Sequence, residues 1–273
     1  MLRCVSFTVL FFALLALLGL PVKAGQQYYV NATGSDAMDC LSLATACATF
    51  QRAINLCPGG AECNINAVGF FSQKINVMQN KSISITGPLT NGVCTNRGAL
   101  QVDDGGEAGK IFFAQDRALL TGQCLSVNST SIGSSGFACR QYAIVDANDV
   151  DFFNFAGGTP INQAEDCKIN VLSPGFHGAT YQIANIEEMS KLKIGGSVTF
   201  GANVAASHGF IGLLYGAIFT WAPSSVTGTI GGYSYQCVDS IIRHGPPPPG
   251  QSQPIPLPGN GQAYPGATAC RIY

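Results

Sequence analysis

The sequence predicts an all-β fold, a right-handed parallel β-helix with a short N-terminal capping helix. Three observations predict it. From about Cys63 onward, an apolar strand, a short polar turn and a second apolar strand recur along the chain. Strands that pair with the coils above and below them need no hairpin turn between them. Only one segment has clear helical periodicity, and charged residues make up 11% of the chain, so the outer positions are mostly Ser, Thr, Asn and Gly.

The repeat is visible in five segments, which read INVMQNKSISITG, IFFAQDRALLTG, AIVDANDVDFFNFAG, QIANIEEMSKLKIGG and FIGLLYGAIFTWAP. The turn positions that we assign to them are Asn80, Asp116, Asn148, Glu187 and Tyr215, at steps of 36, 32, 39 and 28 residues. Irregular steps of this size are expected of solenoid coils whose loops differ in length. A β-sandwich stays open as the alternative, although its turn signals usually recur every 8–12 residues.

The one clear helical pattern is ATFQRAINLC, residues 48–57. Its apolar side chains recur at helical spacing on one face: Phe50, Ala53, Ile54 and Cys57. Thr49 or Thr45 can cap the helix, and the Pro-Gly-Gly that follows ends it. A weaker helical pattern occurs at 185–191. We expect the first helix to cover the open end of the β-structure.

Residues 1–24 have the pattern of a secretory signal peptide. Arg3 precedes an apolar run of 16 residues, Val5 to Leu20, and small Ala24 closes the cleavage site. This run is shorter than the roughly 20 residues that span a bilayer as a helix. We therefore expect cleavage after Ala24, a single β-helix domain at 25–273 without a membrane span, and a periplasmic or extracellular location.

Ten cysteines remain once Cys4 leaves with the signal peptide: Cys40, Cys47, Cys57, Cys63, Cys94, Cys124, Cys139, Cys167, Cys237 and Cys270. An even number behind a secretion signal predicts five disulfides. No two cysteines have the close spacing of a zinc site. Sequence alone does not determine the connectivity, and pairing each cysteine with its neighbour is the simplest arrangement.

Charge argues against a nucleic-acid partner. The mature chain has twelve Lys and Arg against fifteen Asp and Glu, a formal net charge of −3, with no block of like charges. No glycine-rich phosphate motif or serine-hydrolase motif occurs, and the histidines have no metal-ligand spacing, so we expect no cofactor. The Pro-rich segment 244–266 cannot pair as a strand and is predicted to be a surface loop, either a tethered linker or a ligand for a proline-recognising module.

The pattern YYVNATGSDAMDC-x6-CATFQRAINLC at residues 28–57 resembles the first coil of bacterial secreted parallel β-helix proteins of the pectin lyase-like superfamily. The resemblance implies the fold and a long groove on one face of the solenoid. In lyases and hydrolases of that group, carboxylates on stacked coils bind calcium or act on acidic or neutral polysaccharide. No catalytic motif of the family can be matched residue by residue.

Cleavage of an uncharged polysaccharide needs two carboxylates about 5–10 Å apart, one acting as acid and the other as base or nucleophile. The candidate catalytic residues are Asp146, Asp149, Asp151, Arg140, Asp103 and Asp104, with Arg117 as a second candidate base. Asp and Asn in such contexts also stabilise turns by bonding to the backbone. The sequence thus predicts a non-catalytic protein that contacts glycans or the cell envelope. The alternative is a polysaccharide lyase or glycoside hydrolase, with calcium relevant only to the lyase.

Overall fold

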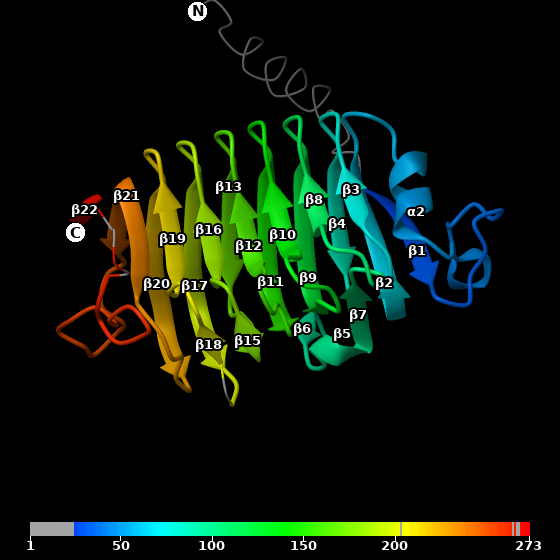
Figure 1. The fold of residues 1–273 in the computed structure, drawn as a ribbon. Coiled ribbons are helices and arrows are strands. Elements are labelled where there is room, and N and C mark those ends of the chain that lie inside the picture. Colours follow the sequence, from blue (N-terminus) through cyan, green and yellow to red (C-terminus); the bar gives the residue numbers. More distant parts are fainter. Residues whose placement is uncertain (1–24, 203, 264, 266–267) are drawn as a thin grey trace, which may run out of the picture.

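The computed structural model describes residues 25–202, 204–263, 265 and 268–273, and it forms a parallel β-helix. Strands of successive coils lie side by side along the molecule, with the helix α2 at one end and β22 at the other (Figure 1). Every pairing within the large 18-stranded sheet is parallel. The sandwich alternative is therefore wrong, because its sheets are antiparallel.

Each coil has three strand segments, and these stack into three faces. The first face contains β1 (Gln26–Asn31), β4 (Ser82–Thr86), β13 (Lys168–Leu172) and the first halves of β2 (Glu62–Ser72), β9 (Leu119–Asn128), β11 (Ile144–Phe153), β17 (Lys191–Phe200) and β20 (Ile218–Thr227). The second face contains β7 (Leu100–Asp103), β14 (Gly175–His177) and the second halves of those five long strands.

The third face completes each coil. It contains β3 (Ile75–Val77), β8 (Lys110–Ala114), β10 (Ser135–Cys139), β12 (Thr159–Gln163), β16 (Ala184–Ile186), β19 (Ile211–Leu214) and the first half of β21 (Tyr235–His244). The second half of β21 returns to the first face, and β22 (Thr268–Ile272) pairs with β21. Smaller elements lie outside the coils: β5 (Leu89–Thr90) with β6 (Val93–Cys94) as a hairpin, β15 (Ala179–Thr180) with β18 (Ala205–Ala206), and the 3-10 turns η1 (Leu43–Thr45) and η2 (Arg97–Ala99).

A column of two-residue turns carries the chain from the third face to the first, and we call it the turn ladder. Both residues of each turn have positive φ: Gln79–Asn80, Asp116–Arg117, Gln141–Tyr142, Glu165–Asp166, Glu188–Met189 and Tyr215–Gly216. In every turn the backbone amide of the second residue donates a hydrogen bond to the carbonyl of the first residue of the corresponding turn in the next coil. These hydrogen bonds are 2.8–3.4 Å long. These stacked hydrogen bonds hold a conformation that costs an ordinary residue roughly 1–2 kcal/mol.

The ladder corrects the predicted repeat. Asn80, Asp116 and Tyr215 do lie on it, but Glu187 precedes its turn by one residue and Asn148 ends the first-face half of β11. From Asp116 to Asp239 the first ladder residues recur at steps of 25, 24, 23, 27 and 24 residues. The sequence-based positions missed two turns, Gln141–Tyr142 and Glu165–Asp166, neither of which contains Gly or Asn.

The interior is filled by side chains that stack from coil to coil. Phe152, Phe176 and Phe200 occupy one register position of the second face, with neighbouring ring centroids 5.4 and 5.7 Å apart. The apolar stretch of residues 210–221 forms β19 and the start of β20, whose inward side chains are buried in the same core. No helix of the described residues is long and apolar enough to cross a membrane.

The predicted helix is confirmed as α2 (Phe50–Leu56). Thr49 is its N-cap, and its hydroxyl accepts the amide hydrogen of Arg52. Phe50 and Ile54 are buried and pack into the core at the N-terminal end of the solenoid. The weaker helical pattern at 185–191 was wrong, because those residues form part of β16, a ladder turn and the start of β17.

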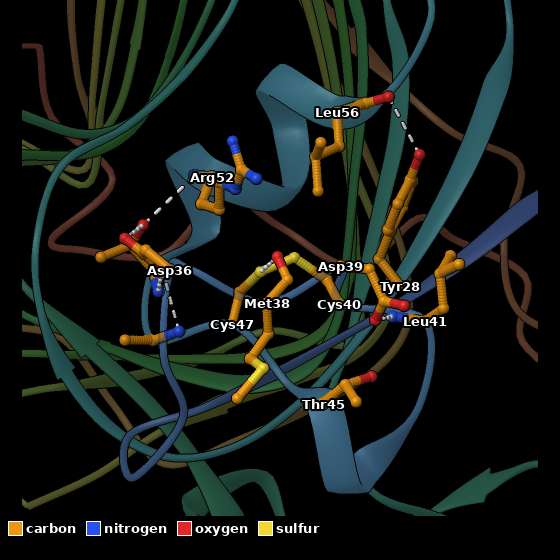
Figure 2. The surroundings of a disulfide bond; sticks show 12 residues. Tyr28, Asp36, Met38, Asp39, Cys40, Leu41, Thr45, Cys47, Arg52 and Leu56 are labelled. Atoms are coloured by element: carbon orange, nitrogen blue, oxygen red, sulfur yellow. Dashed lines mark hydrogen bonds between the residues drawn. A yellow bond between two sulfur atoms is a disulfide. The ribbon is translucent and has the colours of Figure 1, made fainter.

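The chain before α2 is fastened to it by polar contacts around the bridge Cys40–Cys47 (Figure 2). The Asp36 carboxylate accepts hydrogen bonds from the amides of Ala48 and Thr49 at 2.9 Å and from the Thr49 hydroxyl at 2.7 Å. The Tyr28 hydroxyl donates to the carbonyl of Leu56. The N-terminal cap is therefore tied at both ends of the helix.

The structure contains the five bridges of neighbour pairing: Cys40–Cys47, Cys57–Cys63, Cys94–Cys124, Cys139–Cys167 and Cys237–Cys270. The last one joins the strands that flank the Pro-rich segment. Residues 245–262 contain no strand, and they pack beside the last coils, where the Trp221 indole donates to the carbonyl of Pro256 at 3.0 Å.

Candidate functional site

A groove of about 800 Å³ runs along the first face, over the outward side chains of six successive strands. Its lining residues are Thr121, Asp146, Asn148, Lys168, Asn170, Leu172, Lys191, Leu192, Lys193, Ile218, Thr220 and Arg243. They come from β9, β11, β13, β17, β20 and β21. The groove therefore follows the solenoid axis, and it can contact a linear ligand over several coils.

Register explains how residues far apart in sequence meet here. One outward row consists of Thr121, Asp146, Asn170, Lys193, Thr220 and Arg243. In the row beside it, Lys168 pairs with Lys191. Neighbouring strands are about 4.8 Å apart, so these side chains are close enough to contact one ligand. Alternation within β17 places Lys191 and Lys193 outward, with Leu192 buried between them.

The groove carries an excess of positive charge. Lys168, Lys191, Lys193 and Arg243 are all exposed, and in the described part of the chain none of the four forms an ion pair with a carboxylate. Asp146 is the one acidic residue of the lining, and its carboxylate accepts a hydrogen bond of 2.6 Å from the Asn170 amide. A groove lined by one sign of charge attracts ligands of the opposite sign.

The three acidic residues of β11 do not converge as a catalytic group. Asp146 faces the groove, Asp149 forms the corner between the first and second faces with a φ of 53°, and Asp151 lies on the second face. Asp149 and Asp151 both contact Arg97, at 3.3 and 2.7 Å. The His177 imidazole Nε2 is 3.7 Å from Asp151 Oδ1. The two carboxylates thus bind a guanidinium on a separate face from the groove.

This contact fastens an insertion to the second face. Arg97 follows the β5–β6 hairpin, which is itself bridged to β9 by Cys94–Cys124. Gly175 makes room for the carboxylate, because a Cβ at that position would lie 2.1 Å from Asp151 Oδ1. The arrangement is a clamp that holds the hairpin, and we call it the Arg97 clamp.

Asp104 is a buried organiser of a loop. Its carboxylate accepts hydrogen bonds from the hydroxyls of Thr130 and Ser134 and from the amide of Ser131. Burial raises the pKa of Asp104, but these hydrogen bonds outweigh it and hold the pKa well below its usual range. Asp103 accepts the amide hydrogen of Gly105 at 2.9 Å. Both aspartates therefore stabilise turns, which is the structural role that the sequence analysis gives as the alternative to catalysis.

The predicted basic residues also lie outside the groove. Arg140 lies at the end of β10, beside the third face, with Glu165 at 3.7 Å, and Arg117 belongs to the turn ladder. Sequence reasoning missed the four basic residues of the groove. In the sequence, the Lys-Leu-Lys alternation at 191–193 indicates that Lys191 and Lys193 point to the same side of a strand. Placing Lys168 and Arg243 beside these two lysines requires the correct coil length.

No group of three or more His, Cys, Asp or Glu in the described ranges could hold a metal ion. The four basic side chains of the groove suit an anionic ligand. Comparison of the chain with protein-family models, with curated proteins and with solved structures found no match.

Proposed function

We propose that this protein is a secreted, non-catalytic glycan-binding protein that holds an acidic polysaccharide chain in the first-face groove. The observation that carries the proposal is the group of exposed basic side chains in two neighbouring rows, Lys168, Lys191, Lys193 and Arg243, which have no ion-pair partner among the described residues. Lys and Arg bind carboxylate and sulfate groups through charge-assisted hydrogen bonds.

The rest of the lining supports a sugar polymer over a nucleic acid. Thr121, Asn148 and Thr220 offer hydrogen bonds for hydroxyl groups, while Leu172 and Ile218 offer apolar contact for the faces of sugar rings. A nucleic-acid ligand gains its affinity by neutralising many phosphates, and this mature chain is mildly acidic and has four basic residues in the groove.

The geometry gives less support to a lyase or hydrolase. Hydrolysis needs an acid and a base on either side of the scissile bond, and the groove lining contains only one carboxylate, that of Asp146. Asp149 and Asp151 belong to the Arg97 clamp on another face. The proposal therefore assigns binding without turnover.

The location and the family are parts of the same proposal. Five disulfides are typical of an oxidising compartment outside the cytoplasm, and the predicted signal peptide at 1–24 lies outside the described residues. The parallel β-helix with its capping helix at 50–56 supports membership of the bacterial pectin lyase-like group.

The test is binding of the mature chain to polygalacturonate, alginate and hyaluronan, with neutral dextran and double-stranded DNA as further ligands, measured by affinity electrophoresis at low and high salt. We expect retardation by the acidic polysaccharides that weakens with salt. In Lys191→Glu/Lys193→Glu the affinity should fall by about tenfold or more. The matched control is Lys74→Glu, which changes a lysine on another part of the surface.

Several outcomes contradict the proposal. Equal retardation by dextran would show that charge plays no part, and preferential binding of DNA would assign a different ligand class. Release of reducing ends or of unsaturated uronate products by the wild-type chain would establish an enzyme instead.

A further inference from the structure

A second, smaller hollow lies on the third face, away from the groove. Its volume is about 110 Å³, and its lining residues are Lys110, Ala138, Cys139, Arg140, Asn162, Ala164, Asn185 and Glu187. The hollow exists because small side chains interrupt the outward rows: Ala138 lies between Phe113 and Asn162 in register, and Ala164 is adjacent. We call it the third-face hollow.

One end of the hollow is positively charged. The Lys110 ammonium is 3.9 Å from the centroid of the Phe113 ring. Burial lowers the pKa of Lys110, and the nearby charge of Arg140 lowers it further, against an opposing effect of Glu165. Arg140 has only a distant ion pair with Glu165, at 3.7 Å between half-exposed groups. Lys110 and Arg140 therefore repel each other at this end of the hollow, and Glu165 neutralises their charge only weakly.

The other end is negatively charged. Glu187 comes from the coil after Asn162, and its carboxylate accepts a hydrogen bond of 2.8 Å from Asn185. No lysine, arginine or histidine of the described chain is within ion-pair distance of it. The side chain of Asn162 lies between the two ends, with its amide nitrogen bonded to Ser135 at 3.3 Å. The hollow is therefore polarised along the solenoid axis.

We propose that the third-face hollow binds a small zwitterion, a free α-amino acid with a small side chain. Its carboxylate faces Lys110 and Arg140, and its ammonium group faces Glu187. A hollow of about 110 Å³ suits glycine or alanine better than an amino acid with a bulky side chain. Neither a simple anion nor a simple cation would satisfy both ends.

The experiment is isothermal titration of the mature protein with alanine, phenylalanine, acetate, methylammonium and inorganic phosphate. We expect alanine to bind more tightly than acetate, methylammonium or phosphate, and phenylalanine not to bind. Glu187→Gln and Arg140→Gln should each weaken alanine binding at least tenfold. The matched controls are Glu188→Gln and Arg117→Gln, which change neighbouring ladder residues outside the hollow, and these should bind alanine as the wild type does.

The two charged ends are tested separately. Glu187→Gln should leave the affinity for acetate unchanged, whereas Arg140→Gln should lower it. Phosphate binding that equals alanine binding, or alanine binding that survives Glu187→Gln, would show an anion site and overturn the zwitterion assignment. Absence of heat with alanine, confirmed by an unchanged thermal midpoint at millimolar alanine, would also overturn it. Circular dichroism of each variant establishes that it folds.

Discussion

Arg97 Nη1 lies 2.7 Å from Asp151 Oδ1, although 54 residues separate them in sequence. Arg97 extends from the insertion after β4 across the strand β9 to reach β11, and its second nitrogen contacts Asp149 at 3.3 Å. Both side chains of the main contact are about three-quarters buried. The solenoid therefore fixes an inserted hairpin by one guanidinium and one disulfide.

We expect Arg97→Ala to lower the free energy of unfolding by about 1–2 kcal/mol, because it leaves two partly buried carboxylates without their charged partner. Urea unfolding measures this change. The matched control is Lys74→Ala, which removes the exposed ion pair with Glu107 and should have an effect within about 0.5 kcal/mol. Faster proteolysis within 89–94 in Arg97→Ala would locate the loosening at the hairpin, and equal effects of the two variants would contradict the clamp.

Gly175→Ala tests the packing beneath the clamp. A methyl group there would lie 2.1 Å from Asp151 Oδ1 and 3.0 Å from His177 Nε2, so the carboxylate must move away from Arg97. We expect a loss of about 1–3 kcal/mol in unfolding free energy. Gly59→Ala is the control, because a Cβ at that glycine meets nothing within 4 Å. If both variants unfold at the same urea concentration, Gly175 has no steric role.

How far the sequence predicted this molecule depends on the range of the interactions. The helix at 50–56 depends on local periodicity and a local cap, and the neighbour pairing of cysteines joins residues at most 33 apart in sequence; both were predictable. The groove was not, because Lys168 and Lys191 meet only through a register set by coil length. Assigning Asn148 to the turn ladder gave the wrong coil length, and the basic residues then had no common face. The Arg97 clamp could not be predicted from the sequence either, because Arg97 belongs to an insertion outside the repeat.

The pH dependence of stability should contain a contribution from Asp104. Its folded-state pKa is lower than its unfolded value of about 3.9, so this contribution is fully present at neutral pH. It is lost as the pH falls below about 4, because the unfolded chain then binds a proton that the folded chain does not. Unfolding free energies measured from pH 7 to pH 2 should fall less steeply in Asp104→Asn than in the wild type.

At pH 7 the same variant should already be less stable by about 2–4 kcal/mol, because an amide cannot accept all the hydrogen bonds of the carboxylate. Asp103→Asn is the comparison, since Asp103 accepts a single backbone amide hydrogen, that of Gly105. A larger loss in Asp103→Asn than in Asp104→Asn would contradict the assignment of Asp104 as the organiser of the 129–134 loop.

The turn ladder predicts that a glycine can stabilise this protein at one position and destabilise it two residues later. Tyr142 has a φ of 62° and is 62% exposed, so Tyr142→Gly relieves backbone strain and loses little packing. We expect the unfolding free energy to rise by up to about 1 kcal/mol, because the gain from relieving the strain is partly offset by the greater freedom of glycine in the unfolded chain. Ile144 is 39% exposed and lies in β11, where Ile144→Gly should lower stability by about 1 kcal/mol. Urea unfolding measures the change in unfolding free energy of each variant relative to the wild type. The two changes have opposite signs if the stacked hydrogen bonds of the ladder impose the left-handed conformation on Tyr142, and the same sign if they do not.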